Sequence, residues 1–212
     1  MRLAPLAEPS GRAALPFRPT LERTRWLLKQ ALRHQLRVML HALSSTTKHA
    51  GGVAIAAHLA PLLPQDGVVA IFASTADELD TRPLDALLVS RSIGRAAPRI
   101  EGGELVFHVV DGALHDLPID AFGIPTPAST SPRIALSECA LVCVPGLGFD
   151  DDGGRIGYGR GYYDRALRGV ARERIVGLFL DEQRVERVPM FPGDVRLPRL
   201  CTPQRGVVVV DK

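Results

Sequence analysis

Aromatic and sulfur-containing side chains are scarce in this sequence of 212 residues. Aromatic residues make up 5% of the chain, with a single tryptophan, and only three cysteines are present. Cys139, Cys143 and Cys201 form no C-x-x-C pair and have no pair of histidines nearby, which argues against a zinc site and against a disulfide framework. A low, odd number of cysteines suits the reducing cytosol, so a cytoplasmic location is expected.

Apolar runs long enough for a membrane span are also missing. No stretch approaches the roughly 18–20 residues that a transmembrane helix needs, so no membrane association is expected. The net charge of +3 is small and scattered, and by itself it does not argue for nucleic acid as a partner. A locally basic pocket for a phosphorylated ligand would explain it equally well. The remaining composition, 46% hydrophobic and 23% charged, is that of an ordinary soluble globular enzyme.

Residues 1–20 are predicted to be an irregular N-terminal extension, and residues 21–212 a single α/β domain. Prolines recur through the first segment. An arginine-rich targeting peptide is an alternative for it, but Glu8 and the prolines argue against the amphipathic helix that such a peptide needs. A chain of this length can bury one core of good size, or a core with a small lobe.

Residues 21–42 are predicted to form a long helix. Leucines recur at every fourth position from Leu28 to Leu40 and would face the core. Lys29, Arg33 and Arg37 follow one residue later as a basic line. On this pattern alone, a solvated face is the favoured interpretation. However, like charges at this spacing repel one another, and a bound polyanion would relieve that repulsion.

The rest of the chain alternates between strands and helices. The patterns predict helices at residues 51–60 and 81–92 and from Tyr162, and strands at residues 68–73, 96–99, 105–110, 140–144, 174–180 and 206–210. Thr81 is expected to cap the helix that has Pro83 in its first turn. Apolar strands that alternate with helices predict a mostly parallel, twisted sheet flanked by helices, in a Rossmann-like three-layer arrangement.

Two features of the connecting segments are informative. Glu101-Gly102-Gly103 is a turn signal and Asp111-Gly112 a hairpin signal, whereas the proline-rich residues 113–136 and 181–205 are predicted to be irregular. Glu78 follows the strand at residues 68–73, at the end where open α/β sheets place their ligands. A solvated surface charge is the favoured interpretation of this glutamate unless another feature points to it.

The segment at residues 146–163 contains seven glycines and all three tyrosines of the chain. It follows an apolar strand and leads into a helix. A strand, a glycine-rich loop and a helix in this order expose backbone N–H groups and a helix N-terminus, which attract anions such as phosphate. We therefore take this segment as the centre of the candidate active site.

Familiar phosphate-binding loops do not match this segment. No Gly-Lys-Ser/Thr ends it as in a Walker A loop, and the third glycine of the run from Gly157 to Gly161 comes one residue early for a dinucleotide fingerprint. Other side chains add chemistry: arginines suit phosphate oxygens, tyrosines suit a flat ring, and Asp164 suits a metal or a cap. The arginines are Arg155, Arg160 and Arg165. The alternative is a tight loop whose glycines serve turns and whose tyrosines pack into the core.

The stretch from Val144 to Arg165 closely resembles the signature of the 5-formyltetrahydrofolate cyclo-ligase family, also called methenyltetrahydrofolate synthetase. Further segments resemble the family's pattern. Lys29 to Arg33 resembles its Lys-x-x-Leu-Arg helix, and Ile71 to Thr81 resembles its strand followed by Glu-Val-Asp-Thr. Ala97 to Arg99 and Leu105 to Phe107 resemble its middle strands, and Gly177 to Thr202 resembles its C-terminal part. The resemblance covers about residues 27–210 and indicates that residues 21–212 form a cyclo-ligase-like α/β domain.

The resemblance implies an enzyme, a ligase that depends on ATP and Mg²⁺. 5-Formyltetrahydrofolate would become 5,10-methenyltetrahydrofolate through phosphorylation of the formyl oxygen and ring closure by N10, with release of ADP and phosphate. The protein would position the reactants and neutralise phosphate charge, without a covalent nucleophile. The implied partners are small molecules, a reduced folate and the co-substrate ATP, with no nucleic acid and no membrane.

The resemblance also implies roles for individual residues. The expected ATP-binding residues are Lys29, Arg33, Arg155, Ile156, Gly157, Tyr158, Gly159, Arg160, Gly161, Tyr162 and Tyr163. The expected substrate-binding residues are Ala73, Glu78, Tyr158, Gly159, Arg160, Gly161 and Tyr162, with Ala73 and Glu78 lining the pterin pocket. Asp164 and Asp194 would hold Mg²⁺, a hard cation that prefers carboxylate oxygen.

The sequence departs from the family's pattern at two places. Phe191 and Gly193 stand where members usually carry Glu and His before the second metal-binding aspartate, and Thr126 replaces the glutamate of a Glu-Pro pair. These changes motivate an alternative function, a degenerate relative that binds nucleotide or folate without turnover. A nicotinamide or sugar-phosphate enzyme on a similar sheet is a further alternative, but it lacks a fingerprint of its own.

Overall fold

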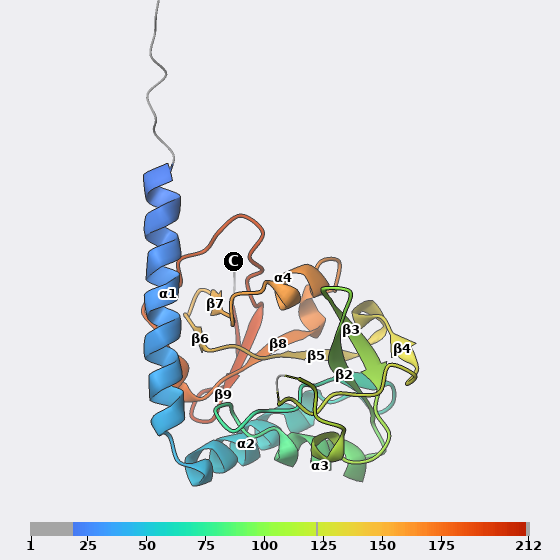
Figure 1. Ribbon diagram of the computed structural model, residues 1–212. Helices are drawn as coiled ribbons and strands as arrows, with labels where there is room; N and C mark the ends of the chain where they lie inside the picture. The colour runs from blue at the N-terminus through green and yellow to red at the C-terminus, as the bar shows by residue number, and fades with distance from the viewer. Residues whose placement is uncertain (1–18, 122, 211–212) are drawn as a thin grey trace, which may run out of the picture.

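The structure is a computed structural model that describes residues 19–121 and 123–210, and it consists of a β-sheet with helices packed on it (Figure 1). The predicted extension at residues 1–20 lies outside the described residues, except that the backbone of its last two residues begins the first helix. The helices are α1 (Pro19–Ala42), α2 (Ser45–Leu59), α3 (Arg82–Ser90) and α4 (Tyr162–Ala166), with 3₁₀ turns at Ala60–Leu62, Leu114–Asp116, Leu136–Glu138, Arg172–Arg174 and Asp181–Gln183. Among the described helices, none is both long and apolar enough to cross a membrane.

Eight strands of the described chain form one mixed sheet in the order β10-β9-β8-β5-β1-β2-β3-β4. Their bounds are β1 Val68–Ala70, β2 Gly94–Glu101, β3 Glu104–Val109, β4 Arg133–Ile134, β5 Leu141–Val144, β8 Ile175–Leu178, β9 Arg199–Thr202 and β10 Gly206–Val209. The central strands from β9 to β2 pair in parallel, and the pairs at both edges are antiparallel. A separate two-stranded ribbon joins β6 (Gly148–Phe149) and β7 (Arg155–Ile156). The predicted α/β fold class, with a mostly parallel sheet between layers of helix, is confirmed.

The central strands are apolar because both faces of the sheet are buried. Successive strand residues point to opposite faces. Val69 and Cys143 pack on the face that α2 and α3 cover, whereas Ala70 and Val142 pack on the other face with Leu167, which follows α4. Figure 1 shows α2 and α3 below the sheet and α4 above it. Strands buried on both faces read as continuous apolar runs, as residues 140–144 do.

α1 stands beside the sheet, and its N-terminal end extends beyond the rest of the domain (Figure 1). Leu36 and Leu40 are buried in the core, but Leu28 is 51% exposed. The prediction that the whole line of leucines faces the core is therefore wrong for Leu28. Leu32, one turn later, packs against the core, whereas Leu28 lies on the part of α1 before that contact begins.

α2 begins six residues earlier than predicted. Ser44 caps it, since its hydroxyl accepts a 3.0 Å hydrogen bond from the backbone N–H of Thr47. Gly51 and Gly52 lie inside the helix and do not begin it. A Cβ atom on Gly52 would lie 2.0 Å from the carbonyl oxygen of Asp80, so glycine is required there for the helix to pack directly on the loop that follows β1.

Other predicted boundaries differ for long-range reasons. The segment at residues 181–205 contains strand β9, which pairs with β8 and β10 and was predicted to be irregular. The β2–β3 hairpin turns at Gly102 and Gly103, and not at Asp111-Gly112, from which the chain leads into a 3₁₀ turn. Thr81 precedes α3 but makes no side-chain cap, because its hydroxyl donates to the carbonyl of Phe72 instead.

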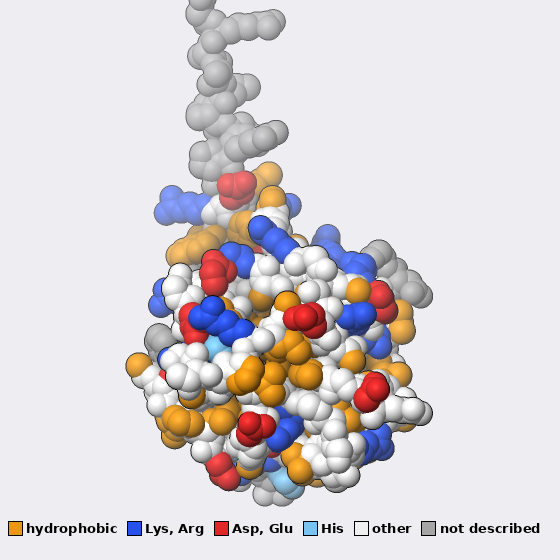
Figure 2. All heavy atoms as spheres, turned by 90° about the vertical axis from the view of Figure 1, so that its right-hand side faces the viewer, with side chains coloured by type: hydrophobic (Ala, Val, Ile, Leu, Met, Phe, Trp, Pro, Cys, Tyr) orange, Lys and Arg blue, Asp and Glu red, His pale blue; other side chains and the backbone are white. Residues whose placement is uncertain are grey.

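The surface carries charges of both signs. On the face shown in Figure 2, basic and acidic side chains alternate around a hydrophobic centre. The small positive excess of the chain is therefore not gathered into one basic area on that face.

Candidate active site

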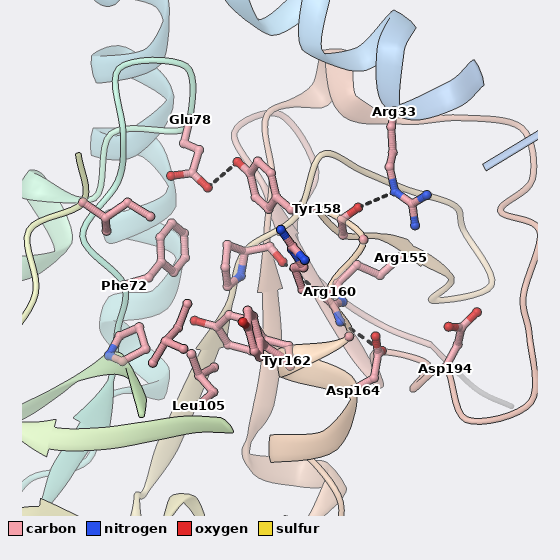
Figure 3. Close-up of a pocket in the computed structure, with 18 of the residues that line it drawn as sticks. Arg33, Phe72, Glu78, Leu105, Arg155, Tyr158, Arg160, Tyr162, Asp164 and Asp194 are labelled. Atoms are coloured by element: carbon pink, nitrogen blue, oxygen red, sulfur yellow. Dashed lines mark hydrogen bonds and ion pairs between the residues drawn. The ribbon is translucent and has the colours of Figure 1, made fainter. Parts of the chain in front are cut away.

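A cavity of about 880 Å³ opens between α1, the glycine-rich loop and the carboxyl ends of β1 and β5. Its position agrees with the general rule that open α/β sheets bind ligands beyond the carboxyl ends of their strands. Its volume lies in the range of small-molecule sites. Figure 3 shows the cavity with Glu78 and Phe72 at one end and Asp164 and Asp194 at the other.

One face of α1 forms a wall of this cavity. The residues that line it recur at helical spacing and are Trp26, Lys29, Gln30, Arg33 and Arg37. Nε of Arg33 donates a 2.9 Å hydrogen bond to the carbonyl oxygen of Gly157, which ties the helix to the glycine-rich loop. Burial and the positive charge of Arg37 lower the pKa of Arg33. The basic line of α1 therefore lines a cavity, and a bound anion would stabilise its charge.

The Asp150 carboxylate fixes the first part of the glycine-rich loop through hydrogen bonds from backbone N–H groups. Oδ1 of Asp150 accepts a 2.7 Å hydrogen bond from the N–H of Gly154, and Oδ2 accepts one of 2.7 Å from the N–H of Val188. Further along, Gly159 and Gly161 have φ angles of 104° and 66°, which favour glycine. These bends place the backbone of residues 157–161 along the cavity wall, where backbone N–H groups can approach a phosphate closely.

Each carboxylate at the right-hand end of the cavity in Figure 3 is paired with a cation. Oδ2 of Asp194 lies 2.5 Å from Nζ of Lys29, and Oδ1 of Asp164 lies 3.0 Å from Nη2 of Arg155. Lys29 and Arg155 are both buried. Backbone N–H groups of Phe191 and Val195 donate to the same carboxylate oxygens. The second oxygen of each carboxylate is thus the one that can bind a cation.

This donor set fits Mg²⁺ as a partner of phosphate, and not as an all-protein site. In the described part of the chain, no group of three or more His, Cys, Asp or Glu side chains could hold a metal alone. Proteins bind Mg²⁺ through one or two carboxylates, completed by waters and substrate phosphates. Asp164 and Asp194 lie at one end of the same cavity and supply that number.

The opposite end of the cavity has apolar walls and contains the Glu78 carboxylate. Phe72, Ile100 and Leu105 line it together with the ring of Tyr162. Oε1 of Glu78 accepts a 2.5 Å hydrogen bond from the Tyr158 hydroxyl.

Hydrogen bonds orient the Glu78 carboxylate, and the Tyr158 hydroxyl stays protonated. The N–H and hydroxyl of Thr75 donate to Oε2 of Glu78. Burial of the Tyr158 hydroxyl and the charge of Glu78 raise the pKa of Tyr158 far above its usual value, so this group remains a hydrogen-bond donor. A flat ring with polar N–H groups at one edge matches this end of the cavity.

The predicted site residues converge on this cavity with one exception. The residues that line it are Lys29, Arg33, Ala73, Glu78, Arg155, Gly157, Tyr158, Gly159, Arg160, Gly161, Tyr162, Tyr163, Asp164 and Asp194. Ile156 does not line it. Its side chain is fully buried in the core, and its carbonyl oxygen accepts a hydrogen bond from the N–H of Leu147. Ile156 can therefore act on a ligand only through the shape of the loop.

Some side chains of the loop fit the alternative interpretation, in which the loop's tyrosines pack into the core. Tyr163 packs edge-on against Phe107, with ring centroids 6.4 Å apart, so this tyrosine belongs partly to the core. Arg165, expected to suit phosphate, does not line the cavity but pairs with Glu104 at 3.2 Å. Tyr158, by contrast, is 45% exposed at the cavity wall.

Several residues that line the cavity escaped the sequence analysis. On α1, Trp26 lies one turn before Lys29 at the same helical spacing, so extending the line of Lys29, Arg33 and Arg37 toward the N-terminus would have found it. Phe72 directly precedes Ala73, which was predicted. Pro98, Arg99 and Leu105 come from the β2–β3 hairpin, and nothing in the local sequence indicates that they face a ligand.

The departures from the family pattern also lie at this cavity. Phe191 lines it, and its ring centroid is 5.0 Å from Nζ of Lys29. Gly193 has a φ angle of 96° and completes the turn that brings Asp194 back onto the N–H of Phe191. Thr126 is buried in the cavity wall. The substitutions therefore change the lining and leave Asp194 in place.

Comparison with known proteins gives a consistent result. The model of the 5-formyltetrahydrofolate cyclo-ligase family matches residues 26–203. The chain is 32% identical over 80 residues to a protein of Mycolicibacterium smegmatis named 5-formyltetrahydrofolate cyclo-ligase, a match that spans 37% of this chain and 41% of that protein. It is 30% identical over 148 residues to the Escherichia coli protein of the same name, spanning 65% of this chain and 78% of that protein.

Solved structures agree with these sequence matches. The NMR structure of 5,10-methenyltetrahydrofolate synthetase from Aquifex aeolicus superimposes with a TM-score of 0.73 at 27% identity, covering 87% of this chain and 94% of that one. The synthetase from Mycoplasma pneumoniae gives a TM-score of 0.65 at 22% identity, over 83% of this chain and 99% of that one, which supports the fold alone.

Proposed function

Because this chain belongs to the 5-formyltetrahydrofolate cyclo-ligase family, we propose that it converts 5-formyltetrahydrofolate to 5,10-methenyltetrahydrofolate with ATP and Mg²⁺. The observation that carries the proposal is the division of one cavity into two ends. Cations and carboxylates suited to a metal-bound triphosphate line one end, and apolar side chains with Glu78 line the other. We propose that the reaction takes place in the cytoplasm, on small-molecule substrates alone.

The reaction needs activation of an unreactive group. The formyl carbon is a poor electrophile because N5 donates electron density toward the formyl oxygen. Transfer of the γ-phosphoryl group to that oxygen releases ADP and turns the oxygen into part of a leaving group. N10 then attacks the formyl carbon and loses its proton to solvent, the C–O bond breaks, and phosphate departs. No covalent bond to the protein is needed, so catalysis rests on positioning and on electrostatic stabilisation.

The protein's task at the phosphate end is to neutralise charge. Lys29, Arg33 and Arg155 would contact phosphate oxygens, and a guanidinium can do so with two parallel hydrogen bonds. The backbone of residues 157–161 adds N–H donors on the same wall. Asp164 and Asp194 would hold Mg²⁺, which when bound supplies further positive charge to the phosphate oxygens.

The protein's task at the folate end is to orient the pterin. Glu78 would accept hydrogen bonds from the amino-pyrimidine edge, which offers paired N–H donors. Phe72, Leu105 and Tyr162 would exclude water from the ring faces. Thr75 and Tyr158 hold the Glu78 carboxylate in place through the hydrogen bonds described above. A pterin fixed in this way would direct its formyl oxygen toward the phosphate end.

A direct assay tests this function. Purified protein with ATP, Mg²⁺ and 5-formyltetrahydrofolate should develop the near-ultraviolet absorbance of the methenyl product, with one ADP formed per product. Omission of ATP is the matched control and should abolish the signal. No product at any protein concentration would overturn the proposal.

A second candidate is a binding protein without turnover. Phe191 and Gly193 favour it, since they lie beside Asp194 where the family usually has charged side chains. Under this hypothesis calorimetry would detect tight binding of nucleotide or folate, while ADP release would be absent. ADP release coupled to methenyl formation would exclude it.

A further inference from the structure

The cavity contains two aromatic side chains that neither the phosphates nor the pterin accounts for, Trp26 and Phe191. Trp26 is the single tryptophan of the chain and is 53% exposed. Aromatic side chains are common in the lining of ligand cavities. The position of these two rings relative to the cations of α1 indicates which part of a ligand they would contact.

The lining residues of α1 show in which order the parts of the cavity follow one another along the helix. Arg37 is the lining residue nearest the C-terminus of α1. Its guanidinium lies 5.9 Å from the ring centroid of Tyr158, which donates a hydrogen bond to Glu78. Arg33 bonds to Gly157 and Lys29 pairs with Asp194 at successive turns toward the N-terminus. Trp26 follows, about 16 Å along the helix axis from Arg37 at 1.5 Å per residue. The order is therefore folate end, phosphate end, Trp26.

Phe191 lies at the same far end. Its ring centroid is 5.0 Å from Nζ of Lys29, and its N–H is bonded to Oδ2 of Asp194, the oxygen that also contacts Lys29. Lys29, Asp194 and Phe191 thus form one unit, with Trp26 one helical turn before Lys29 on α1. Both rings lie at the end of the phosphate region that is farther from Glu78.

In the proposed reaction the γ-phosphoryl group must face the folate, so the nucleoside must extend in the opposite direction, past Lys29. We propose that Trp26 and Phe191 form the base-binding subsite of the nucleotide, with the base stacked on these two rings. The inference rests on the proposed function for the direction of the nucleotide. Stacking suits this position because an exposed indole offers a flat apolar face and the base needs no fixed hydrogen-bond partners.

Calorimetry with two ligands tests the subsite, because inorganic tripolyphosphate shares the phosphates of ATP but has no base. Removal of one stacking side chain weakens binding of a base by roughly tenfold. We therefore expect Trp26→Ala to bind MgATP about tenfold more weakly than the wild type, with the affinity for Mg²⁺-tripolyphosphate unchanged within twofold. Trp26→Phe should restore most of the loss, and Phe191→Leu, which keeps bulk without a ring, should resemble Trp26→Ala.

The neighbouring Leu27 provides a matched control. It is 52% exposed on α1 and does not line the cavity, so Leu27→Ala should leave both affinities unchanged. In the wild type, MgATP should also change the emission of the single tryptophan, and tripolyphosphate should change it much less. Trp26→Ala is expected to fold normally because its side chain is largely exposed.

The possible failures are distinguishable. If Trp26→Ala and Phe191→Leu bind MgATP like the wild type, or lose ATP and tripolyphosphate equally, the base subsite is wrong while the ligase function stands. If Trp26→Ala weakens binding of 5-formyltetrahydrofolate alone, the rings contact the folate and the inference is again wrong. If the wild type binds no MgATP and forms no methenyl product, the proposed function fails and the subsite fails with it.

Discussion

The Tyr158 hydroxyl donates a 2.5 Å hydrogen bond to Oε1 of Glu78, and the two residues are 80 positions apart in the sequence. This contact joins the glycine-rich loop to the loop that follows β1. It holds the Glu78 carboxylate, at the apolar end of the cavity, in a fixed orientation. The two loops therefore form the folate end together, and each depends on the other.

The first prediction concerns this pair. Glu78→Gln should weaken binding of 5-formyltetrahydrofolate by roughly 10- to 100-fold, since hydrogen bonds to a charged group contribute about 1.5–3 kcal/mol. Tyr158→Phe should weaken it less, and the double variant should bind no worse than Glu78→Gln alone, because residues in one hydrogen-bond network are not additive. Calorimetry with folate measures this, and the affinity of Glu78→Gln for MgATP should stay unchanged. Glu104→Gln, an exposed carboxylate outside the cavity, is the control. Additive losses would refute the coupling.

The second prediction concerns Asp164. Asp164→Asn should lower kcat by about 100-fold or more, because a neutral side chain no longer holds Mg²⁺ at the transferred phosphate. The fold should persist, since the amide oxygen can still accept from Arg155 and from the N–H of Val195. The methenyl absorbance assay and circular dichroism measure the two effects. Asp151→Asn is the control, since Asp151 pairs with Arg184 and Arg205 outside the cavity. A near-normal rate for Asp164→Asn would remove the metal role.

The third prediction concerns the pairing of Lys29 with Asp194. In the described structure Asp194 neutralises the lysine that would contact phosphate. Without metal, this carboxylate also repels a triphosphate. Asp194→Asn should therefore bind ATP more tightly than the wild type in the presence of a chelator, by several-fold. With Mg²⁺ present it should bind ATP more weakly, because one metal ligand is lost. Calorimetry under both conditions tests the reversal, and an equal loss in both would contradict it.

The fourth prediction concerns stability in acid. Burial opposes ionisation of Asp80, but hydrogen bonds from Arg82 and His49 outweigh it and lower the pKa of Asp80 to about 2. A carboxylate with a lowered pKa stabilises the fold above its unfolded pKa near 4, and this contribution is lost as the pH falls toward 2. Asp80→Asn should therefore cost about 1–2 kcal/mol at pH 6 and almost nothing near pH 2. Urea denaturation across this range measures the difference. A cost independent of pH would show that the charge of Asp80 does not matter.

Local sequence patterns were sufficient to predict the fold class and several parts of the candidate site. The glycine-rich loop, the basic line of α1 and the buried strand before the loop are each contiguous or repeat at a fixed spacing. Helical and strand geometry fixes how such residues lie relative to one another. The α/β fold class followed from the same patterns, because strands that alternate with helices have few ways to bury their apolar faces.

Tertiary structure decided which of these segments lie next to one another. Lys29 and Asp194 are 165 positions apart, and no local signal indicates that they form an ion pair. Strand β9 was missed because its pairing with β8 and β10 is a long-range property of the sheet. The basic line of α1 became a cavity wall, and Phe191 came to lie beside Lys29, only because the chain packs α1 against the glycine-rich loop and against the segment that carries Phe191 and Asp194. Side-chain spacing is set by the local backbone, whereas the partner across a cavity is set by the packing of the whole domain.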